Sequence, residues 1–445
     1  MFRPAIQRLY ILILMAVFCV LMVVISYNSQ FDYEKPYYNE KVKASNYMFE
    51  GLKVLRESYR SSGNDKWDGE PFADSNEDGI WNEGEKFEDT RPFSSLDPLE
   101  TGMVFYQDGL DGDPSSKLTT LNPNFAALVV ELMVEAGIEK PENRRKKPRV
   151  AIAFSGSIPG ANLAVLSACK AMDIEPFVIT SVSSSNYGAV DYQNFSWLAM
   201  EATLIDQGIF SSKYKSQAAS IGRKNDIGLS LSAVKNYEID EAIKKSDINR
   251  IVIQEEDWFG DIQEGDWWPK YIDKRMKIYD SENIDYDLFI NVGGGVASIG
   301  PKTKIRKTSG FVDSNELSKI YKDNSEKNDC VASRFSQSKV PIINIMNIKN
   351  LVENNLPVIT LATNNFKIDW EGQKWINEKD QASEKESLWK SEINKSGILF
   401  IDRKYSFWVV IPCLMASLML TLGIGLYSHF QIKKRMTSYE PDSVS

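Results

Sequence analysis

The chain has 445 residues, of which 43% are hydrophobic and 25% are charged. This length is enough for two domains of ordinary size, and the composition is that of a folded protein. The formal net charge is −9, and no basic stripe offsets it, which argues against a nucleic-acid partner.

The N-terminal segment, residues 1–26, is predicted to be a transmembrane anchor. Leu9 to Ile25 is an uncharged apolar run preceded by Arg3 and Arg8, and its length is near the short end of a membrane-spanning helix. The residues that follow offer no small-x-small site for cleavage of a signal peptide. We therefore expect the anchor to remain uncleaved.

A second transmembrane helix is predicted over residues 406–428, because Phe407 to Tyr427 is apolar and of spanning length. The basic residues of the tail, residues 429–445, are Lys433, Lys434 and Arg435. Positive charge before the first helix and after the second predicts that both termini lie in the cytoplasm. The residues between the helices are then expected outside the cytoplasmic membrane.

Residues 27–145 are predicted to form a helical segment that carries an acidic insert. Tyr47–Arg60 and Asn124–Ala136 have the apolar spacing of helices. From Gly63 to Asp113, fifteen Asp or Glu residues stand against three Lys or Arg. Little helical or strand pattern is present there, so the plainest interpretation of the insert is a solvated acidic linker.

Part of the insert matches a calcium-binding loop. DSNEDGIWNEGE, residues 74–85, has the ligand spacing of a twelve-residue loop, with Gly79 at the sharp turn. The predicted metal ligands are Asp74, Asn76, Asp78, Ile80 through its carbonyl, Asn82 and Glu85. Gly69 and Pro71 exclude a long entering helix, so the loop resembles those of secreted bacterial proteins. We predict Ca²⁺ here in preference to a bare linker.

A strand, a loop of small residues, a helix and a second strand follow one another from Val150 to Val182. This order is typical of a parallel sheet. Backbone N–H groups and the positive end of the helix dipole converge on the loop, SGSIPG, which makes it a candidate anion site. Its candidate ligand-binding residues are Ser155, Gly156, Ser157, Gly160 and Asn162. Taken alone, the loop is more simply a tight turn that caps a helix.

A second glycine turn, within residues 285–300, follows the predicted strand LFINV. Its candidate ligand-binding residues are Gly293, Gly294, Gly295 and Ser298. In an open parallel sheet both turns would lie at the carboxyl edge, where ligands bind, so together they favour an anion site. The glycines lack dinucleotide spacing and no GxxxxGK[ST] is present. We expect no nucleotide, and a carboxylate-rich ligand suits the location better.

The fold class predicted from these patterns is α/β, with a Rossmann-like parallel-sheet domain over residues 146–400, outside the membrane and between two transmembrane helices. Phe195–Gln207 and Ile239–Lys245 are predicted helices, and Val340–Thr360 is a predicted strand and helix. Asp369–Lys395 is predicted to be a charged helical segment that leads back to the membrane.

Ser155 and Ser157 occupy an elbow-like position after a strand and are the candidate catalytic residues of a hydrolase. The single histidine, His429, lies beyond the second transmembrane helix, which excludes a Ser–His–Asp triad and a histidine zinc site in the outer domain. Ser–Lys chemistry or paired carboxylates remain. The carboxylates that could pair are Glu255, Glu256, Asp257, Asp261, Glu264 and Asp266.

Those carboxylates are more simply the surface of a loop. The three tryptophans among them, Trp258, Trp267 and Trp268, belong either to the core or to an exposed apolar binding surface. Two cysteines, Cys169 and Cys330, lie outside the apolar runs at the termini. They form either one disulfide or buried free thiols.

Three stretches resemble a bacterial family called poly-gamma-glutamate system protein: SGSIPGANLAVLSACKAMDIEPFVITSVSSSNYGA, the helix with SWLAMEATL, and LFINVGGGVASIG. The resemblance covers Val150 to about Gly300 and the N-terminal anchor. It implies a place in the bacterial inner membrane beside the membrane ligase that makes poly-γ-glutamate and that ligase's small membrane partner. The family supplies no catalytic residues to carry over. The acidic insert and the second membrane helix depart from its common pattern.

The resemblance implies an accessory role in the synthesis, export or surface anchoring of poly-γ-glutamate, which is itself a carboxylate ligand. Two other functions remain open: an amide hydrolase or transferase that trims or attaches the polymer, and a surface scaffold stiffened by calcium.

Overall fold

The computed structural model describes residues 4–61, 72–83, 85–86, 97, 101–107, 110–140, 147–223, 228, 231–251, 267–282, 285–301, 303–322, 329–355, 368–369, 374–375 and 399–438. The chain forms two compact units. One joins the two terminal segments, Met1–Pro36 and Phe400–Ser445, and the other is Tyr37–Leu399.

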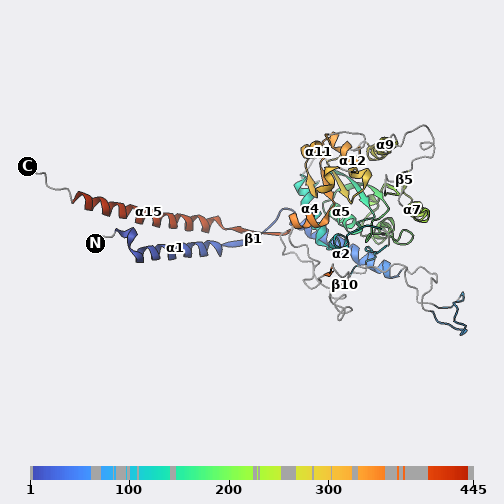
Figure 1. Cartoon of the computed structure of the whole chain (residues 1–445), viewed down its shortest axis with the longest axis horizontal. Coiled ribbons are helices and arrows are strands. Elements are labelled where there is room, and N and C mark those ends of the chain that lie inside the picture. The colour runs from blue at the N-terminus through green and yellow to red at the C-terminus, as the bar shows by residue number, and fades with distance from the viewer. Residues whose placement is uncertain are drawn as a thin grey trace, which may run out of the picture. The chain divides into compact units, whose positions relative to one another are not determined.

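The terminal unit consists of two apolar helices and a two-stranded ribbon. α1 (Leu9–Tyr27) and α15 (Phe407–Thr437) run side by side (Figure 1), and each is long and apolar enough to cross a membrane. β1 (Gln30–Glu34) pairs antiparallel with β11 (Ile401–Tyr405). Most large apolar side chains of both helices are exposed, as lipid-facing side chains are.

The larger unit is built on a seven-stranded sheet in the order β5-β4-β3-β2-β6-β8-β7, in which only β7 runs antiparallel to its neighbour. The strands are β2 (Arg149–Ser155), β3 (Glu175–Ser181), β4 (Ala218–Ser220), β5 (Asn249–Arg250), β6 (Leu288–Val292), β7 (Gly310–Val312) and β8 (Ile342–Ile345). The predicted α/β class with a largely parallel sheet is confirmed. From β2 the chain moves outward through β3, β4 and β5, and β6 then starts the other half. The strand order therefore reverses between β2 and β6, and such a switch point is where doubly wound sheets bind ligands.

Helices cover both faces of this sheet. The helices of the larger unit are α2 (Tyr38–Ser61), α3 (Pro114–Thr119), α4 (Asn124–Glu135), α5 (Pro159–Ala171), α6 (Trp197–Asp206), α7 (Ala233–Lys245), α9 (Trp267–Tyr279), α10 (Val296–Ile299), α11 (Ser314–Ile320), α12 (Val331–Gln337) and α13 (Ile348–Asn355). Short 3₁₀ turns lie at Ser212–Tyr214, Asp280–Glu282 and Lys304–Lys307.

The core has two parts, one on each face of the sheet, because successive side chains of β2 point to opposite faces. Ala151 and Ala153 belong to one hydrophobic cluster with residues of α9, α11 and α12, in which the rings of Tyr279 and Phe335 meet edge-on. Phe154 points to the opposite face, where its ring meets that of Trp197 edge-on. α2 and α4 pack on α5 there. Because β2 is buried on both faces, it reads as a continuous apolar run in the sequence.

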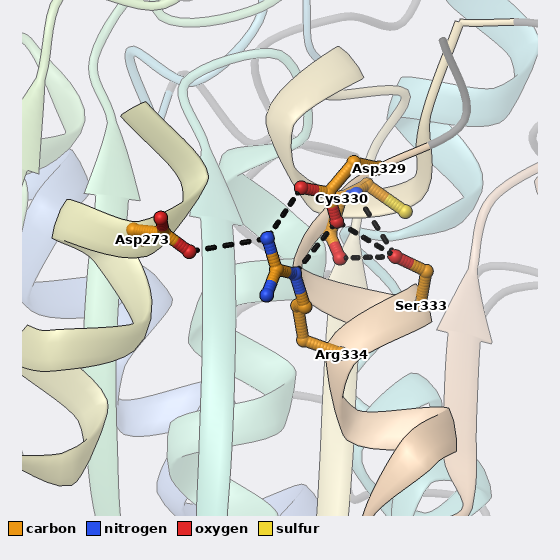
Figure 2. A network of polar contacts seen from close by, with 5 residues as sticks. All are labelled: Asp273, Asp329, Cys330, Ser333 and Arg334. Atoms are coloured by element: carbon orange, nitrogen blue, oxygen red, sulfur yellow. Dashed lines mark hydrogen bonds and ion pairs between the residues drawn. The ribbon is translucent and has the colours of Figure 1, made fainter. Parts of the chain in front are cut away.

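A polar network pins α12 to α9 (Figure 2). Arg334 donates two hydrogen bonds of 2.7 Å to Asp329 and lies 3.1 Å from Asp273 of α9. Ser333 closes the first turn of α12, because its Oγ accepts from the Cys330 N–H at 3.0 Å. This network lies at the edge of the aromatic core, and it holds that core together rather than forming a site.

Several elements differ in their bounds or type from those predicted. The helix predicted at Tyr47–Arg60 begins at Tyr38, and the one predicted at Ile239–Lys245 begins at Ala233, where Ser232 accepts from the Lys235 N–H. The predicted helical segment Asp369–Lys395 is wrong for its described residues, which lie in two short paired strands, β9 (Ile368–Asp369) and β10 (Lys374–Trp375). Lys374 pairs with Asp369 and Trp375 with Ile368 across these strands, and isoleucine and tryptophan are residue types that favour strands.

Cys169 and Cys330 are both free and buried. Burial raises the pKa of Cys169 to about 12 and that of Cys330 to about 11, so both behave as apolar groups. The carboxylates predicted as a pairing group, Glu255 to Asp266, and Trp258 lie outside the described residues.

Candidate anion-binding pocket

A cavity of about 500 Å³ opens at the carboxyl edge of the sheet, at the switch point between β2 and β6. We call it the anion pocket. Its lining is rich in serine and glycine and includes two basic residues and one acidic one. The residues that line it are Gly112, Asp113, Ser116, Lys117, Ser155, Ser157, Ile158, Ser181, Ser183, Ser184, Ser185, Gly222, Arg223, Gly293, Gly294, Gly295, Val296, Met346, Asn347 and Ile348.

The two glycine turns predicted from the sequence meet in this pocket. Parallel pairing of β2 with β6 brings their ends together, and a Cβ on Gly293 would lie 3.1 Å from the Ser155 Cβ. Gly293 also has φ +91°, a conformation that favours glycine. Ser155, Ser157, Gly293, Gly294 and Gly295 all line the pocket. The sheet therefore brings the two turns into one site.

Gly294 and Gly295 of the second turn line the pocket, and hydrogen bonds to the carbonyls of Gly293 and Gly294 fix the direction of their amide N–H groups. The Gly293 carbonyl accepts from Asn291 Nδ2 at 2.8 Å, and the Gly294 carbonyl accepts from Arg306 Nη2 at 3.0 Å. Because N–H and C=O point in opposite directions across a trans peptide, the N–H groups of Gly294 and Gly295 point away from these anchors. Within the described residues neither N–H has an acceptor.

The first turn has fewer donors to offer. The Gly156 N–H donates to the Ser181 carbonyl at 2.9 Å, and the Ser157 N–H donates to Ser155 Oγ at 3.0 Å. These bonds hold the turn closed against the end of β3. The first turn thus shapes the pocket, while the free amides come from the second.

Four predicted ligand-binding residues, Gly156, Gly160, Asn162 and Ser298, are not among the residues that line the pocket. Gly160 packs against α3, because a Cβ there would lie 2.7 Å from Thr120 Oγ1. Asn162 is fully buried and donates to the Ser155 carbonyl at 3.0 Å, so it supports the turn from behind. Ser298 is buried in α10, and its Oγ has no hydrogen-bond partner among the described residues.

Arg223 enters the pocket from the end of β4. Gly222 has φ +86° and Arg223 φ +64°, and two successive left-handed residues reverse the chain sharply. Within the described part of the chain, Arg223 Nε and Nη2 are inaccessible to water and have no hydrogen-bond partner. Unpaired guanidinium donors are costly, and a carboxylate that reached Nε and Nη2 would satisfy both. Because neither atom is open to water, the side chain must shift to make that contact.

Lys117 is the second basic residue of the pocket. It lies on α3, which Asp113 caps by accepting from the N–H groups of Ser115 and Ser116 at 3.1 and 3.2 Å. Lys117 Nζ donates to the Ser157 carbonyl and lies 3.0 Å from Ser185 Oγ. The side chain is buried, and this burial lowers the pKa of Lys117 to about 7, although the nearby Asp113 acts in the opposite direction. Near neutral pH the amine therefore exists in both protonation states.

Sequence reasoning did not find Lys117, Arg223 or Ser185. The capping sequence of α3, Asp113-Pro114-Ser115-Ser116, was a usable signal. No sequence pattern near Arg223 or Ser185 indicates a binding residue. Each lies in the pocket because the order of the strands in the sheet places the loop that carries it there.

The predicted calcium ligands lie in a separate, exposed loop, Asp74–Glu85, which we call the acidic loop. Its side chains bond to its own backbone: Asp74 accepts from the N–H groups of Asp78 and Gly79, and Glu85 accepts from those of Ser75 and Asn82. The Ile80 N–H donates to Asp78 at 2.7 Å and is the main cause of the lowered pKa of Asp78, while the Asn82 N–H is the main cause of the lowered pKa of Glu85. Among the described residues, no three His, Cys, Asp or Glu side chains group as a metal site.

Comparison with known proteins gives no relative: no protein-family model, no curated protein and no solved structure matches this chain.

Proposed function

We propose that this protein is a membrane-anchored accessory component of poly-γ-glutamate synthesis, export or surface anchoring, and that it binds a carboxylate ligand in the anion pocket. The poly-γ-glutamate part of the proposal rests on the resemblance of the turn sequences, and the ligand class rests on the pocket. In this proposal both termini are cytoplasmic, the sheet domain lies outside the inner membrane, and the ligase and its small membrane partner are its neighbours.

One observation carries the ligand class: the pocket gathers donors that have no acceptor. Arg223 Nε and Nη2 and the N–H groups of Gly294 and Gly295 are unpaired within the described residues. The acidic lining residue, Asp113, already accepts from three groups of α3. A carboxylate can accept from a guanidinium and from backbone amides at once, so it fits this set of donors.

The volume agrees with a small segment of polymer. A cavity of about 500 Å³ is within the range of pockets that hold small molecules. Among the serines of the lining, Ser183 and Ser184 come from the loop after β3. The Ser184 hydroxyl donates to the Ser185 carbonyl at 2.7 Å, so Ser183 is the one of the two that can offer a hydroxyl proton to a chain of carboxylates and amides.

Calorimetry on the full chain in lipid nanodiscs tests the ligand class. A γ-linked glutamate oligomer should bind to the wild type, and Arg223→Gln should weaken binding by roughly 10- to 100-fold, the worth of a charge-assisted pair. Lys319→Gln removes an exposed charge on α11 and is the matched control. Equal affinity in Arg223→Gln and the wild type would contradict the proposal.

The cellular role has its own test. Deletion of the gene should change the amount or the chain length of surface polymer, and Arg223→Gln restored in its place should reproduce the deletion. If surface polymer is unchanged in both strains, the poly-γ-glutamate assignment fails even where the pocket binds glutamate in vitro.

Calcium is a second part of the proposal. Glu85 reaches from position twelve of the acidic loop to Ser75 at position two, where its carboxylate accepts at 3.0 Å from the N–H and at 2.8 Å from Oγ. The loop is thereby closed with Asp74, Asp78 and Glu85 in one segment, as calcium loops are. We propose that Ca²⁺ stiffens this exposed loop.

A further inference from the structure

We propose that Lys117 and Ser185 form a base–nucleophile pair that cleaves an amide bond of the ligand held in the anion pocket. The inference rests on the proposed function, because it needs the same pocket to hold the substrate. It differs from the expectation drawn from the sequence, in which Ser155 and Ser157 were the candidate nucleophiles.

The geometry favours Ser185 over the other serines. Lys117 Nζ lies 3.0 Å from Ser185 Oγ, within hydrogen-bond reach. The contact of Lys117 with Ser157 is to the backbone carbonyl, not to the hydroxyl. Ser155 Oγ accepts from the Ser157 N–H, and Ser157 Oγ accepts from the Ser185 N–H. Neither of those hydroxyls has a base beside it among the described residues.

The amine is held in an orientation that suits a base. One N–H of Lys117 is committed to the Ser157 carbonyl, so the lone pair of the neutral amine can accept the Ser185 hydroxyl proton. The Ser185 hydroxyl donates to no acceptor among the described residues. Ser185 is half-buried and lines the pocket, where a ligand can reach it.

The proposed reaction is a hydrolysis and needs no oxidant or reductant. Ser185 Oγ attacks the amide carbon while its proton moves to Lys117 Nζ, so that a C–O bond forms and the carbonyl oxygen becomes negative. The N–H groups of Gly294 and Gly295 are donors in the same pocket for that oxygen. Lys117 then gives its proton to the leaving amine as the C–N bond breaks, and water hydrolyses the serine ester by the reverse proton path.

The charged groups that share the pocket set the substrate class. Among the described lining residues, the other charged ones are Asp113, the N-cap of α3, and Arg223 after β4. Asp113 is bound to the helix that it caps. Arg223 is then free to hold a carboxylate on one side of the cleaved bond. The substrate class is an amide that carries a nearby carboxylate, as a γ-linked glutamate chain does.

A fluorophosphonate probe on the full chain in lipid nanodiscs tests the pair, because it reacts only with an activated serine. Peptide mapping should find the label on Ser185, and its rate should rise about tenfold between pH 6 and pH 8 as Lys117 loses its proton near its pKa of about 7. Ser185→Ala should abolish the label. Lys117→Met and Lys117→Arg should each slow it at least ~100-fold, as expected for loss of a general base.

Ser211→Ala is the matched control, since Ser211 is exposed and makes no cap hydrogen bond, and it should label as the wild type does. Far-ultraviolet circular dichroism of each variant separates loss of chemistry from loss of fold. A label on Ser155 or Ser157, a rate that ignores Lys117, or no label on the folded wild type would overturn the inference.

Incubation with γ-linked glutamate oligomers, followed by mass spectrometry, tests the substrate. Shorter oligomers should appear with the wild type and not with Ser185→Ala. If Ser185→Ala still binds the oligomer in calorimetry while the wild type neither labels nor cleaves, the proposed binding function stands and this inference fails. If the wild type labels at Ser185 but binds no glutamate oligomer, the proposed function fails, and with it the assignment of a glutamate-chain substrate.

Discussion

The anion pocket and the acidic loop carry opposite charge and are built in opposite ways. The acidic loop takes all its polar groups from twelve consecutive residues and bonds them to its own exposed backbone. The anion pocket takes its groups from the ends of β2, β3, β4 and β6 and from α3, and it buries one of its two cations. A local loop can tolerate changes around it, whereas a site assembled by the sheet depends on every segment that reaches it.

The largest expected difference in stability between the two sites comes from a matched pair of glycine substitutions. Gly222 in the pocket has φ +86°, and a Cβ there would lie 2.3 Å from Ser183 Oγ. Gly79 in the acidic loop has φ +72° with open space around it. Gly222→Ala should cost about 4 kcal/mol of folding free energy, through strain plus overpacking, and Gly79→Ala about 1 kcal/mol, through strain alone.

Thermal unfolding of the two variants measures the difference. Arg223 follows Gly222 directly, so Gly222→Ala should also abolish glutamate binding, while Gly79→Ala should leave it unchanged. Similar losses of stability in both variants would remove the distinction between an assembled site and a local one.

Lys117→Met tests whether the buried cation is kept for function. Its pKa falls from 10.5 to about 7 on folding, so the charged form destabilises the native state. That cost is absent above pH 10.5, grows as the pH falls toward 7 and is constant below. We expect Lys117→Met to stabilise the protein by about 4 kcal/mol at pH 7 and by almost nothing near pH 10.5.

Unfolding at both pH values checks the sign, with Lys319→Met on α11 as the control that should show no pH-dependent gain. A loss of stability in Lys117→Met at pH 7 would mean that the lysine is structural and that its two hydrogen bonds outweigh its burial.

Calcium binding tests whether the acidic loop, like the anion pocket, is a binding site. Calorimetry should give a dissociation constant on the order of 10⁻⁴ to 10⁻³ M, as in extracellular modules, and Glu85→Gln should weaken it roughly tenfold by removing the charge of a bidentate ligand. Since the pKa values of Asp78 and Glu85 are lowered, affinity should hold level as the pH falls from 8 to 6. Glu77→Gln, at a non-ligand position of the loop, is the control. Heat that is the same with and without Glu85 would exclude the site.

The smallest effect is expected at a place that serves neither site. Arg334→Ala removes the ion pair with Asp273 of α9 and the one with Asp329, both shown in Figure 2, but Arg334 is about one-third exposed. Solvent screening reduces the loss to about 1 kcal/mol. Unfolding should show this loss, while calcium and glutamate binding stay at wild-type values; a change in either would tie this network to a site.

The local signals in the sequence were enough for the frame of the pocket. β2, α5 and β3 follow one another in the order predicted for the stretch from Val150 to Val182, and Gly293 follows β6 as the strand pattern predicted. The meeting of the two turns followed from one rule, that parallel strands end at a common edge. Gly160 and Asn162 lie behind the turn, where they contact the end of α3 and the end of β2. Helix periodicity alone does not show which face of α5 points to the pocket, so their position was not predicted.

The groups that give the pocket its chemistry were not readable in this way. Lys117 sits on a helix of six residues, too short to show a period. Its neighbour Ser185 is 68 residues away in the sequence. Arg223 depends on the two left-handed residues after β4, and no propensity marks an arginine for that conformation. Long-range strand order, not local pattern, decides these positions.

The β1–β11 ribbon has a mechanical consequence. The Lys35 N–H donates to the Phe400 carbonyl at 2.9 Å, and Lys41 Nζ donates to the Leu399 carbonyl at 3.0 Å. Hydrogen bonds therefore join the segment that follows β1 to the segment that precedes β11. A single peptide cut in either strand would leave the domain attached through the other. Release of the domain from the terminal helices therefore requires two cuts, one in each connecting segment.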